Sequence, residues 1–250
     1  MFFTRLPLWR WHQPDQDAFK AVVEFWPLTG WLTAGVMAGV LYASSLVFPY
    51  PVAVLLAIIS RLMLTGALHE DGLADFFDGF GGGGNDRQRI LDIMKDSRIG
   101  TYGVLALILY LALLSATLLS MQPADAALTI LMADPYAKMI SAQVIQMMPY
   151  ARTAETAKSH VVYRKFSWVA GVSLAVQGLL PAALYLWWMQ GRVDWQLIVF
   201  LPCLMMYFLY RLIWHRLRGY TGDCCGAIFL LTELVIYLIA TYCFSISLIG

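Results

Sequence analysis

Three aspartates, Asp71, Asp75 and Asp78, follow one another at spacings of four and three residues. On a helix, which turns by about 100° per residue, this spacing places the carboxylates within roughly 60° of arc on one face. Carboxylates so close together repel one another, and a nearby membrane of low dielectric strengthens the repulsion. Either their pKa values rise or a divalent cation lies among them. Mg²⁺ typically takes a few carboxylates together with waters and substrate phosphates.

A second acidic pair, Asp92 and Asp96, is also spaced for one helix face. Residues 86–97 are expected to form an amphipathic helix with Asn85 or Asp86 as its N-cap. Two acidic helices joined by a loop would clamp one or two metal ions, and two-metal sites stabilise both the attacking and the leaving oxygen in phosphoryl transfer. The predicted metal ligands are Asp71, Asp75, Asp78, Asp92 and Asp96.

The expected loop between these helices is rich in glycine, at Gly79 and from Gly81 to Gly84. Without Cβ atoms, glycines let the backbone approach a ligand closely and turn its N–H groups toward phosphate. Gly82 and Gly83 are therefore candidate substrate contacts. A plain flexible hinge is the alternative.

Basic and imidazole groups flank the acidic region. Lys95 and Arg98 follow the second pair, where they would neutralise a diphosphate or a leaving group. They are otherwise ordinary basic residues at a membrane surface. His69 precedes Asp71 by two positions and points away from the aspartate face, so we expect a supporting or substrate-contacting role, with general base as an alternative.

A third polar stretch, Gly219–Ala227, lies before the last apolar segment. Thr221 and Asp223 are candidate substrate contacts, although Asp223 is equally suited to capping the helix that follows. Glu233 lies about two turns into that segment, where an acid requires a partner or a ligand.

The rest of the chain is strongly apolar, with a mean hydropathy of +0.66 and 13% charged residues against about 25% in soluble domains. We expect an all-α polytopic helical bundle in the membrane, forming one domain over residues 1–250. Residues 1–25 are expected to lie at the membrane interface, and residues 69–103 to form a catalytic loop between spans two and three. Seven apolar windows are predicted spans: Trp26–Phe48, Val52–Leu68, Gly103–Met121, Ala126–Met148, Trp168–Met189, Trp195–Ile213 and Ala227–Ile249. Six spans are an alternative, because the second window is short and contains Arg61.

Basic residues alternate across these windows. Fourteen of the 17 Lys and Arg fall on one side and only Arg192 on the other, while Arg61 and Lys138 lie within spans. The positive-inside rule therefore predicts a cytoplasmic N-terminus and a cytoplasmic acidic loop. Within the spans, Asp134 and Lys138 are spaced to form an ion pair on one helix face. Arg61 is expected to reach the headgroups or the acidic loop, and the four cysteines to be free thiols.

The motif H-x-D-G-L-A-D-x-x-D-G (His69–Gly79), followed by K-D-S-R-x-G-x-x-G (Lys95–Gly103), resembles the cobalamin (5'-phosphate) synthase family, also called adenosylcobinamide-GDP ribazoletransferase. Further fragments agree in order, so the resemblance spans nearly the whole chain. One departure follows P-Y-A-R, where the family tends to have a glycine-rich turn and this chain reads TAETAKSHVVYRK. The further fragments are T-R-L-P (Thr4–Pro7), F-W-P-L-T-G (Phe25–Gly30), P-Y-A-R (Pro149–Arg152) and T-G-D-x-x-G-A (Thr221–Ala227) with Glu233.

The resemblance implies a Mg²⁺-dependent enzyme of the bacterial inner membrane. It would join adenosylcobinamide-GDP to α-ribazole or its 5'-phosphate and release GMP. Arg152, Thr221, Asp223 and Glu233 are carried over as substrate contacts. The implied partners are these substrates and the lipid bilayer, with a homo-oligomer and other corrinoid-pathway enzymes left open; no nucleic acid is expected.

Two alternatives stay open. Asp75-x-x-Asp78-Gly79 and Asp92-x-x-x-Asp96 are similar to the paired motif of CDP-alcohol phosphotransferases, and this likeness makes Asp96 a general-base candidate. The Ala-Arg that should follow Asp-Gly is absent, however, and the spacing is short. A cation transporter that coordinates its ion with the carboxylates is the alternative of a different class, although most of the acids lie at the membrane edge instead of mid-membrane.

Overall fold

A computed structural model describes residues 3–7, 10, 15–152 and 162–247. Every regular element in these ranges is helical, and an isolated bridge joins Tyr150 to Tyr220. This confirms the expected all-α class. The elements are α1 (Gln16–Lys20), η2 (Val22–Phe25), α2 (Trp26–Ser45), α3 (Tyr50–Thr65), α4 (Leu68–Gly82), α5 (Arg87–Lys95), α6 (Thr101–Leu119), α7 (Pro123–Ala142), α8 (Val144–Met147), α9 (Trp168–Met189), α10 (Trp195–Leu217) and α11 (Gly222–Ser247).

Each predicted apolar window corresponds to a helix, and the window Trp168–Met189 coincides with α9. The window Ala126–Met148 is not one helix, because the chain breaks at Gln143 between α7 and α8. By length and composition α6, α9, α10 and α11 are able to cross a membrane, and the bent pair α3–α4 adds a fifth span if it is counted as one. The chain is thus a multi-pass membrane protein, and the number of seven spans stays a prediction.

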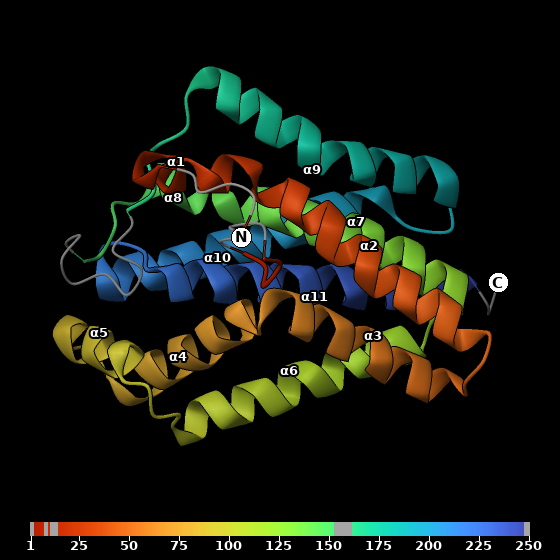
Figure 1. Cartoon of the computed structure of the whole chain (residues 1–250), viewed down its shortest axis with the longest axis horizontal. Helices are drawn as coiled ribbons and strands as arrows, with labels where there is room; N and C mark the ends of the chain where they lie inside the picture. The colour runs from red at the N-terminus through yellow and green to blue at the C-terminus, as the bar shows by residue number, and fades with distance from the viewer. Residues whose placement is uncertain (1–2, 8–9, 11–14, 153–161, 248–250) are drawn as a thin grey trace.

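Helix α7 lies in the middle of the bundle, where it packs against α2, α9 and α11 (Figure 1). Its buried polar pair, Asp134 and Lys138, forms the expected ion pair, with Nζ 2.5 Å from Oδ1. The Thr33 hydroxyl of α2 donates to the other Asp134 oxygen at 2.7 Å, so the pair also ties two helices together. Large apolar side chains on the outer helices are exposed, as lipid-facing residues are, among them Leu109 of α6 and Phe208 of α10.

The turn between α3 and α4 decides where the acidic region lies. The two helices meet at 88°, and both connecting residues, Gly66 and Ala67, adopt left-handed backbone angles. Gly66 is required there, because a Cβ would lie 2.1 Å from Nε of Arg5. The backbone N–H of Arg5 donates to the carbonyl of Leu64, so the N-terminal segment packs over the break. Phe3 is buried in the same segment, Phe2, Trp9 and Trp11 lie outside the described residues, and the interfacial position of residues 1–25 stays a prediction.

The glycine-rich stretch is mostly helix and not the predicted loop, because α4 continues through Gly82. Its glycines let α5 pack directly on α4. A Cβ on Gly79 would lie 2.5 Å from Met94, and one on Gly83 would lie 2.4 Å from Ile90. Close helix packing, and not an exposed phosphate-binding loop, therefore explains these two positions. Asp86 caps α5, as expected, by accepting from two backbone N–H groups.

Candidate active site

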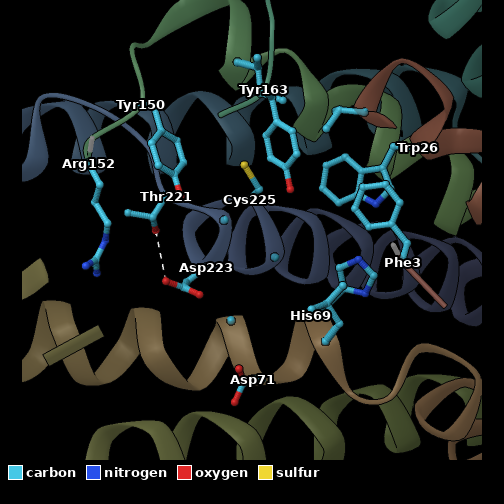
Figure 2. A pocket seen from close by; sticks show the side chains of 16 residues that line it. Phe3, Trp26, His69, Asp71, Tyr150, Arg152, Tyr163, Thr221, Asp223 and Cys225 are labelled. Atoms are coloured by element: carbon cyan, nitrogen blue, oxygen red, sulfur yellow. Dashed lines mark hydrogen bonds between the residues drawn. The ribbon is translucent and has the colours of Figure 1, made fainter. Parts of the chain in front are cut away.

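A cavity of about 160 Å³ lies where the start of α4 meets the start of α11. It brings together five predicted site residues from three distant parts of the chain: His69, Asp71, Arg152, Thr221 and Asp223. Figure 2 shows a polar side, with Arg152, Thr221 and Asp223, and an aromatic side, with Phe3, Trp26 and His69. The HxD, P-Y-A-R and T-G-D fragments thus meet at one place.

Two glycines allow α4 and α11 to approach so closely. A Cβ on Gly72 would lie 3.1 Å from the Cα of Asp223, and one on Gly226 would lie 3.2 Å from the carbonyl oxygen of His69. A Cβ at either position would be closer to the facing backbone than ordinary contact, so one helix would have to shift by a few tenths of an ångström. The pair Gly72 and Gly226 therefore sets the distance between the HxD and T-G-D residues.

The polar side is built on the N-terminus of α11. The Thr221 hydroxyl accepts from the backbone N–H of Cys224 at 3.3 Å, so Thr221 caps the helix. This leaves Asp223, in the first turn, as a partly exposed carboxylate on the cavity wall. Arg152 is held by a hydrogen bond from Nη2 to the carbonyl of Leu91 in the middle of α5. The segment 153–161, which contains most of the sequence departure after P-Y-A-R, lies outside the described residues.

Two tyrosines close the cavity between its polar and aromatic sides, and both phenols point into it in Figure 2. Burial raises the pKa of Tyr150 to about 12. Burial also raises the pKa of Tyr163 well above its usual value. Both phenols therefore keep their protons at neutral pH and are hydrogen-bond donors.

Asp78 faces away from this cavity. Its carboxylate accepts from the backbone N–H groups of Gly100, at 2.7 Å, and Gly103, at 2.8 Å. These groups belong to the start of α6, where a helix leaves N–H groups without partners inside the helix. Asp78 therefore caps the start of α6, a role that is separate from its predicted role as a metal ligand.

Asp96 pairs with Arg98, with 2.7 Å between Oδ2 and Nη2. Hydrogen bonds from the Arg98 side chain and backbone lower the pKa of Asp96 to about 2. A carboxylate with so low a pKa is a weak general base at neutral pH. Asp78, Gly82, Asp96 and Arg98 line a separate, open hollow beside the start of α6, so the structure divides the predicted site into two groups.

The remaining predicted residues lie elsewhere. Asp92 is exposed on α5 and accepts from the Gln88 side chain at 2.9 Å, and Lys95 is exposed one turn later. Asp75 is half-buried on α4, one turn after Asp71. The described residues hold no cluster of three or more His, Cys, Asp or Glu side chains placed to bind a metal ion, and the metal clamp formed by the two acidic sets stays a prediction.

Glu233 lies inside the bundle instead of on the cavity, which is a correction to its expected substrate contact. It is fully buried, and both of its oxygens accept from Nη1 of Arg61 at 2.8 Å. Tyr237 donates to the same carboxylate at 3.0 Å. Arg61 also lies 3.7 Å from Glu70, so it does reach the acidic region as expected. The acid inside the apolar segment has a protein partner and needs no ligand.

Sequence reasoning gave no role to the aromatic residues of the cavity wall. The signal was present, because Trp26 lies in the F-W-P-L-T-G fragment, Tyr150 lies in P-Y-A-R, and Phe3 directly precedes T-R-L-P. From sequence alone, these fragments serve only as evidence of the family resemblance. Their convergence requires the break after α3 and the return of the chain to α11.

Comparisons with known proteins agree with the sequence resemblance. The sequence profile of a family described as cobalamin-5-phosphate synthase matches residues 1–241. An adenosylcobinamide-GDP ribazoletransferase of Leptospira interrogans is 32% identical over 242 residues, covering 95% of this chain and 91% of that protein. Proteins of the same name are 36% identical in Shewanella baltica over 245 residues and in Leptothrix cholodnii over 242 residues, each covering 95% of this chain and 90% of the relative. No solved structure matches.

Proposed function

Because the chain belongs to the cobalamin-5-phosphate synthase family, we propose that it joins adenosylcobinamide-GDP to α-ribazole, or to α-ribazole 5'-phosphate, and releases GMP. The observation that carries this proposal is the convergence of three separate family fragments on one cavity. His69 and Asp71, Arg152, and Thr221 and Asp223 come from distant parts of the chain.

In this reaction a ribose hydroxyl of ribazole attacks the phosphorus that bears the cobinamide. A new P–O bond forms, the bond from this phosphorus to the oxygen of GMP breaks, and the hydroxyl proton goes to a base. The carboxylate of Asp223 is the acceptor that we propose for this proton, because it borders the cavity, whereas the carboxylate of Asp71 points away from Asp223 in Figure 2. Arg152 is placed to bind phosphate oxygens, for which its guanidinium geometry is suited.

Mg²⁺ is part of the proposal, and the donor chemistry of the cavity fits it. Mg²⁺ is usually bound by one or two carboxylates and keeps waters and substrate phosphates as its other ligands, so a third carboxylate is not needed. Asp223 is the carboxylate on the cavity wall that would hold it. The ion would supply charge neutralisation for the diphosphate.

The experiment is GMP release by the purified protein in detergent or liposomes, with adenosylcobinamide-GDP and α-ribazole. We expect release that requires ribazole and stops when Mg²⁺ is chelated. Absence of GMP release, together with cation flux into liposomes, would refute the enzyme proposal and favour a transporter. The same preparation, reconstituted in vesicles made from inner-membrane lipids, tests function in the expected membrane.

Matched Asp→Asn variants test the residues. Asp223→Asn should lower kcat/KM by about 10²-fold or more and raise the Mg²⁺ concentration required, since it removes a charge acting at the reaction centre. Asp75→Asn, on the same α4 face as Asp71, is also expected to abolish activity. Asp92→Asn should change activity less than about twofold, because Asp92 lies outside the cavity. If Asp92→Asn alone caused a large loss of activity, this result would favour a metal site clamped between the two acidic helices.

A further inference from the structure

Three rings of the cavity wall are stacked on one another. Phe3 and Trp26 have ring centroids 5.6 Å apart at 18°, and Trp26 and His69 have centroids 6.0 Å apart at 22°. Phe229 of α11 meets the His69 ring edge-on at 4.8 Å. All four side chains are buried, so this aromatic wall, formed by Phe3, Trp26 and His69 and supported from behind by Phe229, is held in place by packing.

Two nitrogen atoms of the wall are buried and lack a hydrogen-bond partner among the described residues: Nε1 of Trp26 and Nε2 of His69. Leaving a buried polar group unpaired is costly, and most such groups in folded proteins are satisfied. Both residues line the cavity. Neither nitrogen has appreciable surface open to the cavity, so a hydrogen-bond acceptor on an occupant would reach one of them only with a small shift of the ring.

The size of the cavity limits what this occupant can be. Its volume of about 160 Å³ is close to the roughly 150 Å³ of an apolar cavity known to admit a benzene ring. One small aromatic ring system fits such a space. A corrin macrocycle is several times larger and does not.

The two sides of the cavity match the two parts of a nucleoside. The aromatic wall lies on one side, and Arg152, Thr221 and Asp223 lie on the other (Figure 2). An apolar base against the wall would therefore direct its ribose toward Asp223 and Arg152. This is the direction that the proposed attack of a ribose hydroxyl requires.

We propose that the aromatic wall binds the benzimidazole base of the ribazole substrate; this inference rests on the proposed function. The base packs its face against the wall, and its one free ring nitrogen accepts a hydrogen bond from Trp26 or His69. Guanine, the other base in the reaction, carries several more donors and acceptors than this wall can pair. Burying these donors and acceptors without partners costs free energy. The wall therefore selects ribazole over the guanine nucleotide.

The first test compares two identical substitutions of buried phenylalanines. Phe3→Leu removes a ring of the wall, whereas Phe76→Leu removes an equally buried ring of α4 that stacks on Phe80 and does not line the cavity. Stacking of a base on an aromatic side chain is worth a change of about fivefold or more in affinity. Phe3→Leu should raise KM for α-ribazole by about five- to tenfold and leave KM for adenosylcobinamide-GDP within twofold. Phe76→Leu should change neither KM.

Trp26→Phe keeps a ring and removes only the N–H group, which tests the hydrogen bond separately from stacking. The second test needs no variant and so does not depend on folding. Free benzimidazole base should inhibit the wild-type protein competitively against α-ribazole but not against adenosylcobinamide-GDP. Guanine should not inhibit at the same concentration.

Equal effects of Phe3→Leu on both KM values, or inhibition by benzimidazole that competes with adenosylcobinamide-GDP, would overturn the base assignment while leaving the transfer reaction intact. If the wild-type protein releases no GMP, the proposed function has failed. Equilibrium binding of α-ribazole to the wild type and to Phe3→Leu then tests the wall directly. Binding that Phe3→Leu weakens about fivefold supports the wall, and unchanged or absent binding refutes it.

Discussion

Replacing Asp78 separates a structural cap from a metal ligand. Its carboxylate is 7% exposed and accepts from the backbone N–H groups of Gly100 and Gly103 at the start of α6. Asp78→Ala leaves both N–H groups without this acceptor. Asp78→Asn keeps one accepting oxygen but turns an NH₂ group toward the other N–H, so it should be about half as damaging.

The expected magnitude follows from these two bonds. A hydrogen bond to a charged group contributes about 1.5–3 kcal/mol, and a negative charge at a helix N-terminus adds about 0.3–1 kcal/mol. Because such contributions are not additive, Asp78→Ala should cost about 3–5 kcal/mol. In a chain of this size each kcal/mol shifts Tm by about 2–4 °C, so we expect a Tm lower by about 6–20 °C.

Gly103→Ala is an independent perturbation of the same contact. Its Cβ would lie 2.5 Å from Oδ2 of Asp78, so it should displace the carboxylate without removing it. Alanine normally stabilises a helix by about 1 kcal/mol relative to glycine, and a loss of stability here would therefore report the displaced cap.

The assay is thermal unfolding of the purified protein in detergent, read beside the Mg²⁺ dependence of GMP release. A cap predicts a lower Tm with an unchanged Mg²⁺ requirement in the protein that remains folded. An unchanged Tm with a Mg²⁺ requirement raised tenfold or more would refute the capping role and return Asp78 to the metal site.

Three further predictions concern charged groups outside the cavity. Glu233→Gln should cost about 3–5 kcal/mol, because it leaves Arg61 charged and without its carboxylate partner in the interior; thermal unfolding measures this, and wild-type stability would contradict it. Asp134→Asn should lower yield or Tm while the folded protein stays active, and a full-yield inactive protein would instead place Asp134 in the site. The lowered pKa of Asp96 means that its pairing with Arg98 stabilises the fold above about pH 4 and is lost as the pH falls toward 2. Asp96→Asn should therefore leave the acidic limb of the pH–rate profile unchanged, and a shifted limb would make Asp96 the base.

Much of the fold was predictable because it depends on composition and local spacing. A helix that crosses a bilayer must be long and apolar. The windows that form α6 and α9 can therefore be recognised from hydropathy alone. The Asp134–Lys138 pair followed from a spacing of four residues, and the Asp86 cap from residue type. Family membership followed from motifs that the chain carries in order.

The composition of the site was only partly predictable, because helical spacing says which residues share a face but not what that face meets. Asp71 and Asp78 share a face of α4, and the structure turns this face toward the start of α6 and away from Asp223. The glycines at positions 79 and 83 predict a loop from sequence alone. In the structure their lack of side chains lets α5 pack closely on α4.

The sequence by itself determined a helical membrane protein, its family and a set of chemically suitable residues. Only the tertiary structure decided which of them meet. The break at Gly66 and Ala67 turns α4 across α11, and Gly72 and Gly226 let the two backbones touch, which brings His69 and Asp223 to one cavity. The same packing joins Glu233 to Arg61, 172 positions away in the chain. Contacts over such separations depend on how helices cross, and residue spacing along one helix carries no information about that crossing.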